Sequence, residues 1–277
     1  MMTEKMRGKK RAFAARKTSL CISFLVVFLI LDFAVSFGLS AADRTDVVVL
    51  ISADAEWKPV RAAWAKEAGS ATPYGEFISR TLEAGGKKLS AVYFHGGWGK
   101  IAAAASTQYA LDRWNPRLLV NIGTCGGFEG DVRNGDLLLV TKTIVYDIVE
   151  MMGDSDDAVA DYTTALDLRW LKKPYPASVR ESLLISADRD IQPSEIPRLR
   201  QKYGAVAGDW ESGAIAFVAA RNRVPCLILK AVSDIVGMSG GEAYGNTELY
   251  EQRTKGIMIR LMDLLPAWLR AAGPLFK

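Results

Sequence analysis

The stretch RLLVNIGTCGGF, residues 117–128, decides the fold of this 277-residue chain. Residues 117–123 are mostly apolar, as is typical of a strand buried on both faces, and TCGGF predicts a turn that ends it. Two similar runs, DVVVLIS at 46–52 and PCLILKAVSD at 225–234, predict further buried strands. Strands of this kind form parallel sheets that helices cover on both faces.

Other patterns alternate with these strands along the chain. FISRTLEA and KLSAVYFHG, joined by Gly85-Gly86, predict a hairpin, and residues 135–145 predict one more strand. Residues 154–178 show little periodicity and predict a surface excursion. Helical patterns occupy residues 57–69, 101–114, 193–203, 209–222 and 247–271. Residues 43–277 therefore predict a single α/β domain with a mixed, largely parallel central sheet flanked by helices.

The basic residues are concentrated at the N-terminus. The chain holds 35 Lys and Arg against 31 Asp and Glu, but residues 1–42 hold seven of the basic residues and only two of the acids. Residues 43–277 are left with 28 basic and 29 acidic side chains, close to neutral. The basic balance thus gives no indication of nucleic-acid binding.

The same N-terminal segment has the features of a secretory leader. A cationic stretch ends at Lys17, the apolar run LCISFLVVFLIL fills residues 20–31, and the small residues Ser40-Ala41-Ala42 suit signal peptidase. Residues 1–42 are expected to be a signal peptide, or an uncleaved membrane anchor if residues 33–39 extend the apolar run. A start codon assigned too far upstream is a third interpretation. The first two predict export, periplasmic or extracellular, with membrane contact only through this segment.

Cysteine and histidine content excludes several classes of site. Cys125 and Cys226 lie in apolar or glycine-rich segments, where a free Cys behaves as a small buried hydrophobe, although a disulfide between them is an alternative. His95 is the only histidine. His-rich zinc sites are therefore excluded, as are most nucleophile–His–acid triads, and no metal site is expected.

Three acids stand where ligands bind in such folds, at the carboxyl ends of strands. Glu56 follows the strand at 46–52, Asp234 ends the strand at 225–234, and Glu211 opens the helix at 209–222. Each has a structural alternative, because acids complement the helix dipole and Asp caps helices or forms turns. Their position beside glycine-rich turns favours a functional role.

These segments carry a resemblance to a known family. NIGTCGGF, the Gly135-Asp136 pair, DWESGAIAFVA and VPCLILKAVSD, in this order, resemble the nucleoside phosphorylase/nucleosidase superfamily, most closely its methylthioadenosine/S-adenosylhomocysteine nucleosidases. The similarity extends from about residue 46 to 271. SADAEWKPV, WESGAIAFVA and KAVSD place Glu56, Glu211 and Asp234 on the family's functional acids.

The resemblance implies a role for each acid in cleaving a purine N-glycosidic bond without a cofactor. Asp234, oriented by Ser233, would protonate the departing base, and Glu56 would activate water. Glu211 would accept hydrogen bonds from the ribose hydroxyls. The expected substrates are adenine nucleosides such as methylthioadenosine or S-adenosylhomocysteine.

Two other functions on the same fold remain open. A phosphorylase would need cations around phosphate, but Asn121 stands where many phosphorylases have Arg, which leaves Lys100 and Lys230. A nucleoside-binding or storage protein is the third function, and relatives of that kind tend to lose one of the acids. The resemblance also implies a homodimer in which a neighbour's side chain closes the 5′ end of the pocket.

Several positions depart from the family pattern. Asp190 stands where an aromatic residue would stack on adenine, while Ile191 still offers its backbone to the base edge. Trp210 replaces a Met beside Glu211, and Tyr244 stands where a closing aromatic is expected. In GGWGK, Gly96 replaces a Ser that would hold water. Gly97, in the same turn, allows close approach of the backbone to the substrate.

Overall fold

The computed structural model describes residues 44–277, so the predicted leader lies outside the described residues. The helices are α2 (Asp54–Ala63), α3 (Gly99–Trp114), α4 (Ser155–Asp161), α5 (Ile196–Tyr203), α6 (Ser212–Arg221) and α7 (Thr247–Ala271), with 3-10 turns η1 (Pro193–Glu195) and η2 (Gly273–Phe276). The strands are β1 (Val47–Ile51), β2 (Ser70–Ala71), β3 (Glu76–Ala84), β4 (Lys87–His95), β5 (Leu118–Phe128), β6 (Leu137–Val145), β7 (Thr163–Ala165), β8 (Arg180–Ser186), β9 (Ala207–Asp209), β10 (Cys226–Gly237) and β11 (Gly240–Gly241).

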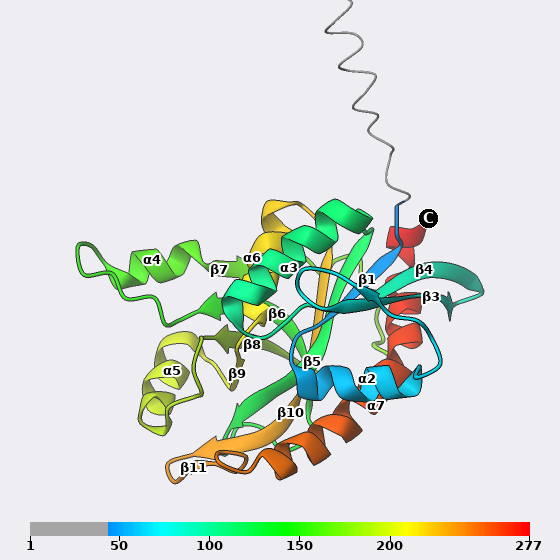
Figure 1. The fold of residues 1–277 in the computed structure, drawn as a ribbon. Helices are drawn as coiled ribbons and strands as arrows, with labels where there is room; N and C mark the ends of the chain where they lie inside the picture. Colours follow the sequence, from blue (N-terminus) through cyan, green and yellow to red (C-terminus); the bar gives the residue numbers. More distant parts are fainter. Residues whose placement is uncertain (1–43) are drawn as a thin grey trace, which may run out of the picture. The chain divides into compact units, whose positions relative to one another are not determined.

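Four parallel strands, in the order β4-β1-β5-β10, form the centre of the sheet (Figure 1). The hairpin partner β3 extends this sheet antiparallel to β4. On the other side β10 also pairs with β6, and β6, β8, β9 and β5 pair in turn, so these strands close into a ring. The predicted single α/β domain with a mixed sheet is confirmed.

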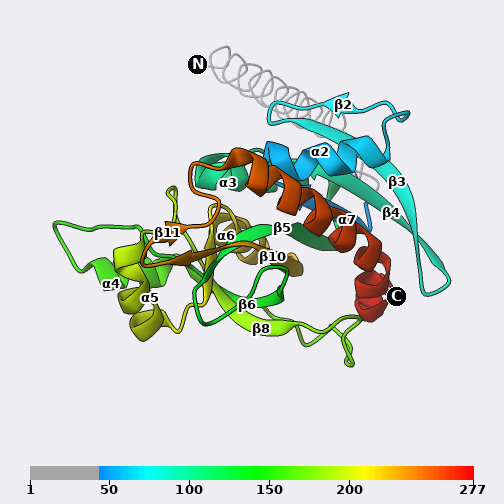
Figure 2. The ribbon, with the colours of Figure 1, turned by 90° about the horizontal axis from the view of Figure 1, so that it is seen from below.

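Helices cover both faces of the sheet, because successive side chains of a buried strand point to opposite faces. Val47, Val49 and Ile51 of β1 belong to one hydrophobic cluster, which includes residues of α2 and α7. Val48 and Leu50 belong to a second cluster, with residues of α3 and α6. Figure 1 shows α3 and α6 on one side of the central strands and α2 and α7 on the other, and Figure 2 shows α2 and α7 side by side.

The turn predicted at TCGGF is wrong, because β5 continues through it to Phe128. Gly126 pairs with Gly208 of β9, and a Cβ at Gly127 would lie 2.4 Å from Val132 Cγ2 and 2.8 Å from Val232 Cγ1. The glycines therefore allow close packing against β9 and β10 and do not reverse the chain.

The helix predicted at 57–69 is displaced and spans Asp54–Ala63. It begins earlier because the Glu56 carboxylate accepts a hydrogen bond from the backbone N–H of Ala53, as in a capping box. Pro59 thus lies inside the helix and not in its first turn. Part of the surface excursion at 154–178 is ordered as α4 and β7.

Other sequence predictions agree with the structure. The helix at 247–271 is α7, and the hairpin at Gly85-Gly86 is β3–β4. Cys125 and Cys226 are both free and buried, so the alternative disulfide is not formed. Within residues 44–277, no helix combines the length and the hydropathy that crossing a membrane requires.

Candidate active site

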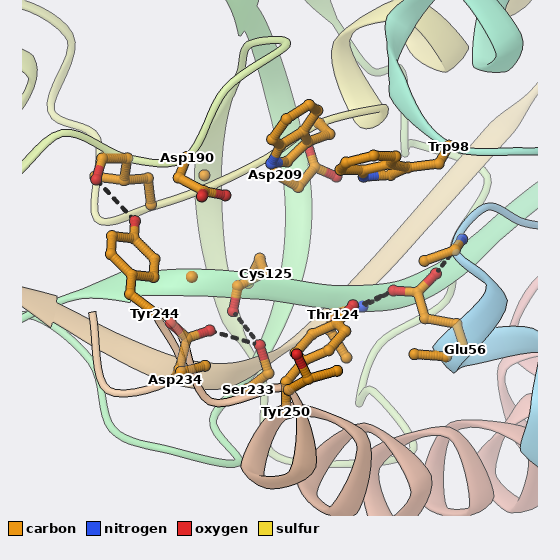
Figure 3. A pocket seen from close by; sticks show the side chains of 18 of the residues that line it. Glu56, Trp98, Thr124, Cys125, Asp190, Asp209, Ser233, Asp234, Tyr244 and Tyr250 are labelled. Carbon is orange, nitrogen blue, oxygen red and sulfur yellow. Dashed lines mark hydrogen bonds between the residues drawn. The ribbon is translucent and has the colours of Figure 1, made fainter. Parts of the chain in front are cut away.

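The carboxyl ends of β1, β5 and β10 meet at one cavity of about 730 Å³, a size typical of small-molecule sites. Seven of the eight predicted site residues line it: Glu56, Ile191, Trp210, Glu211, Ser233, Asp234 and Tyr244. Figure 3 labels Glu56, Ser233, Asp234 and Tyr244 among them. Gly97 is not among the lining residues, although its neighbour Trp98 is. Residues far apart in the sequence therefore converge as the parallel topology requires.

Glu56 lies buried at one end of the cavity and is held by a neighbouring strand. Its Oε1 accepts hydrogen bonds from the backbone N of Thr124 at 2.6 Å and from the Thr124 hydroxyl at 2.9 Å. Its Oε2 accepts from the backbone N of Ala53 at 3.3 Å. Donors from β5 and from the start of α2 thus hold the carboxylate in place.

Ser233 and Asp234 line the same cavity although they are consecutive residues of a strand. The register between β5 and β10 shifts between Val232 and Asp234, so Ser233 forms a β-bulge. A bulge breaks the alternation of side chains and re-aims them, which allows both to face the cavity. The Ser233 hydroxyl lies 2.8 Å from Asp234 Oδ1 and 3.3 Å from the Cys125 carbonyl oxygen, and it orients the carboxyl group.

The surroundings of the Asp234 carboxyl group favour its protonated form. Burial, the largest influence, raises its pKa above the ordinary value, and the carboxylates of Glu242 and Asp190 act in the same direction. The Ser233 hydroxyl and the Arg253 guanidinium oppose this rise without cancelling it. A carboxyl group with a raised pKa is suited to general-acid catalysis.

Glu211 and Asp209 form a second acidic group, built around the buried ammonium of Lys230. Asp209 pairs with Lys230 at 3.1 Å, and Glu211 Oε1 accepts from the backbone N of Gly99 at 3.0 Å. Burial, followed by the repulsion of Asp209, raises the pKa of Glu211 to about 8. Burial disfavours the ammonium, but Asp209, Glu56 and Glu211 outweigh this and hold the pKa of Lys230 above its usual value.

Tyr244 closes another side of the cavity. Its hydroxyl donates to the backbone oxygen of Ile191 at 2.7 Å, so the carbonyl predicted to face a base edge already has one partner. Asp190, the departure from the family's aromatic residue, also lines the cavity and its side chain is exposed.

The sequence did not indicate four other lining residues: Trp98, Thr124, Asp209 and Tyr250. Thr124 and Asp209 stand in segments already quoted for the resemblance. Thr124 directly follows Gly123, and Asp209 lies two residues before Glu211, and these positions are the signal that could have indicated them. Tyr250 comes from α7, and its hydroxyl lies 3.4 Å from Thr124 Oγ1. Only the packing of α7 against the sheet brings it there. Within residues 44–277, no three His, Cys, Asp or Glu side chains are arranged to hold a metal ion.

A family model described as the phosphorylase superfamily matches residues 47–262. The chain belongs to the phosphorylase superfamily. Among curated relatives, the 5′-methylthioadenosine/S-adenosylhomocysteine nucleosidase of Maridesulfovibrio salexigens is 29% identical over 191 residues, 65% of this chain and 80% of that one. The nucleosidase of the same name from a Marinomonas species is 25% identical over 229 residues, 78% and 97% of the two chains. With several other relatives the chain spans about two thirds of their length.

Solved structures share this superfamily fold. The nucleosidase of Neisseria meningitidis in complex with methylthio-immucillin-A has a TM-score of 0.62 and 20% identity, covering 82% of this chain and 99% of its own. The S-adenosylhomocysteine nucleosidase of Streptococcus pyogenes has a TM-score of 0.64 and 14% identity, covering 82% and 97%. The predicted family and fold are therefore confirmed.

The two cations that the sequence left for a phosphate ligand are both engaged. Lys230 pairs with Asp209, and its side chain is fully buried. Lys100 pairs with Asp147 and lies 3.7 Å from Asp188. Neither residue lines the cavity.

Gly123 of β5 leaves room for the side chains of Glu56 and Lys230. A Cβ at Gly123 would lie 2.6 Å from Glu56 Oε1 and 2.9 Å from Lys230 Nζ, too close for either to stay in place. Gly123→Ala should lower stability by about 1–3 kcal/mol and shift the Glu56 carboxylate. Gly256→Ala on α7, where a Cβ meets open space, is the control and should not destabilise the fold. Thermal unfolding measures both variants. Equal unfolding temperatures of Gly123→Ala and Gly256→Ala would show that position 123 has room for a Cβ.

The raised pKa of Glu211 predicts a pH-dependent difference in stability. Because the folded pKa lies near 8 and the unfolded value near 4.5, the wild type loses stability as pH rises through this window. Glu211→Gln cannot ionise and keeps an acceptor for Gly99 N. The unfolding temperature of the variant minus that of the wild type should therefore increase from pH 5 to pH 9. A difference that stays constant would show that Glu211 titrates normally.

Proposed function

We propose that this protein hydrolyses the N-glycosidic bond of purine nucleosides, with adenine nucleosides of the methylthioadenosine type as the preferred class. The observation that carries the proposal is that two buried carboxyl groups with different surroundings line one cavity. Glu56 accepts hydrogen bonds from two backbone N–H groups and a hydroxyl, whereas burial raises the pKa of Asp234. Such a pair suits a base and an acid that act in one reaction.

Asp234 acts on the departing base. Cleavage builds negative charge on the purine, and a proton delivered to N7 neutralises that charge as the bond breaks. The Ser233 hydroxyl, 2.8 Å away, holds the acid in position through the transfer.

Glu56 acts on water. Its carboxylate accepts a proton as the water oxygen attacks C1′, where positive charge develops in the ribose. Glu211 supports the sugar by accepting hydrogen bonds from its hydroxyl groups, and the nearby Gly99 N–H keeps the carboxyl group oriented.

Hydrolysis is favoured over phosphorolysis by the charges of the cavity. Its two lining cations, Lys58 and Arg189, pair with Glu251 at 2.6 Å and Glu195 at 2.8 Å. A phosphate dianion would have to break such pairs and lie among carboxylates.

Substrate profiling tests the proposed class. Methylthioadenosine, S-adenosylhomocysteine, adenosine and inosine are incubated separately with the purified protein, and free base is quantified by chromatography. Release of adenine from at least one adenine nucleoside, with slower release of hypoxanthine, is expected. Binding of these compounds without release of base would instead indicate a nucleoside-binding protein.

The N-terminal 42 residues are proposed to direct export, as their cationic and apolar segments indicate. The protein recovered outside the cytoplasm should begin near Ala42 or Asp43, as determined by mass spectrometry of the intact chain. A membrane fraction that retains residues 1–42 would favour the anchor. A cytoplasmic protein beginning near residue 43 would exclude both forms of export.

A homodimer is the proposed assembly. Val149, Met151 and Met152 are 74%, 89% and 97% exposed, and they lie within four residues of one another after β6. Clustered apolar side chains of this kind mark interaction surfaces. Light scattering coupled to size-exclusion chromatography should give twice the chain mass, and Met151→Glu together with Met152→Glu should lower it.

A further inference from the structure

Two indole rings contact each other in the wall of the cavity. The centroids of Trp98 and Trp210 are 4.5 Å apart, with the ring planes tilted by 31°. Trp98 precedes Gly99 and Trp210 precedes Glu211, and these two following residues are joined by the hydrogen bond from Gly99 N to Glu211 Oε1. This bond ties the two segments together and holds the indoles side by side.

The Trp98 side chain is 63% exposed, which is unusual for the largest apolar residue. Trp98 lines the cavity directly before Gly99, whose φ of +83° is a conformation that few other residues adopt. The loop therefore presents the indole to the cavity instead of burying it. Aromatic faces presented in this way bind apolar groups or, more selectively, cations.

The charges around the indoles distinguish between these two kinds of ligand. The cavity lining has two cations, which are already paired, and seven carboxylates. The carboxylates are those of Asp54, Glu56, Asp190, Asp209, Glu211, Asp234 and Glu251. Arg189, the sequence neighbour of Asp190, pairs instead with Glu195 at 2.8 Å. Asp54 has an 88% exposed side chain and contacts His95 at 3.2 Å.

The excess of acid persists when protonation is taken into account. Even with Asp234 and Glu211 neutral, and with Lys230 balancing Asp209, the carboxylates of Glu56, Asp54 and Asp190 remain. A cavity with one sign of charge concentrates ligands of the opposite sign. An indole face adds to this attraction for a cation and not for a neutral group.

We infer that the cavity selects purine nucleosides whose 5′-substituent carries a positive charge, a sulfonium or an ammonium, which the faces of Trp98 and Trp210 bind. The inference rests on the proposed function for the orientation of the nucleoside. With the base at Asp234 and the ribose at Glu211, the indoles beside Glu211 lie on the sugar side. Figure 3 shows Trp98 and Asp209 on the side of the cavity opposite Ser233 and Asp234.

The test compares two ligands that differ by one methyl group and one charge. The ligands are 5′-methylthioadenosine and its S-methyl sulfonium, 5′-deoxy-5′-(dimethylsulfonio)adenosine. Dissociation constants are measured by calorimetry with the full-length Asp234→Asn protein, in which cleavage of either ligand is slowed by about 10²–10⁴. The sulfonium should bind at least tenfold more tightly at low ionic strength, and the ratio should decrease as salt is raised.

Variants then assign the preference to the indoles. Trp98→Leu in the same background should reduce the ratio to below threefold, whereas Trp98→Phe should retain part of it. Trp64→Phe is the control, because Trp64 contacts Tyr93 and Arg80 and does not line the cavity.

The outcomes separate this inference from the proposed function. Equal or tighter binding of the neutral thioether overturns the inference and leaves nucleoside hydrolysis in place. An undiminished ratio in Trp98→Leu overturns the role of the indole. If neither ligand binds and the wild type releases adenine from neither, the proposed function fails and this inference fails with it.

Discussion

Asp234→Asn is expected to leave the fold intact and to reduce turnover of purine nucleosides by about 10²–10⁴, the range associated with loss of a general acid. The Asn amide keeps the size of the side chain and its contact with Ser233, but it has no proton to give to the departing base. Because burial raises the pKa of Asp234, the wild type carries that proton at a higher pH than an ordinary Asp would. Steady-state kinetics with adenine release as the signal measures the loss.

Two further results make this prediction specific. Glu248→Gln, which neutralises an exposed carboxylate in the first turn of α7 outside the cavity lining, should retain full activity. Substrates with a more acidic leaving base should be less affected by Asp234→Asn, because they depart with less need of a proton. Activity of the variant within threefold of the wild type would remove Asp234 from the mechanism.

Glu56→Gln should reduce turnover by a similar factor, about 10²–10⁴, because the amide cannot accept a proton from water. In the wild type the backbone N of Thr124 donates to Glu56 Oε1 at 2.6 Å. The amide group of Gln has only one acceptor oxygen, so this oxygen must face the Thr124 N–H and the NH2 group must point away from it. The effect should fall on kcat more than on KM, since the bound substrate is not held by this carboxylate. Glu83→Gln, on β3 with an exposed side chain outside the cavity lining, is the matched control. A loss confined to KM would place Glu56 in binding.

The sequence predicted the strands at the centre of the sheet well because they are apolar on both faces. The run at 46–52 contains β1, and the run at 225–234 contains most of β10. The short strand β9 was missed because its three residues leave no periodicity. β8 was missed although Leu183–Ile185 are apolar, because the strand opens on the charged pair Arg180-Glu181 and its apolar run is only three residues long.

The acids of the site were located from the ends of strands, but their surroundings were not. Glu56, Glu211 and Asp234 follow segments whose pattern the sequence displays. The ion pair of Lys230 with Asp209 depends on packing between β10 and β9, and the contact of Trp98 with Trp210 depends on two loops that meet. Interactions of this kind join residues more than 100 positions apart or from different elements, and single-sequence patterns do not encode them. The turn expected at TCGGF failed for the same reason, because close packing and chain reversal both require glycine.

Product analysis in phosphate-free buffer tests whether water is the nucleophile. Methylthioadenosine is incubated with the purified protein after removal of phosphate, and in parallel with phosphate added in excess. The predicted result is release of adenine and a reducing sugar at the same rate in both samples, with no sugar 1-phosphate in either. Turnover that occurs only with phosphate, and yields the sugar 1-phosphate, would show that phosphate and not water is the nucleophile.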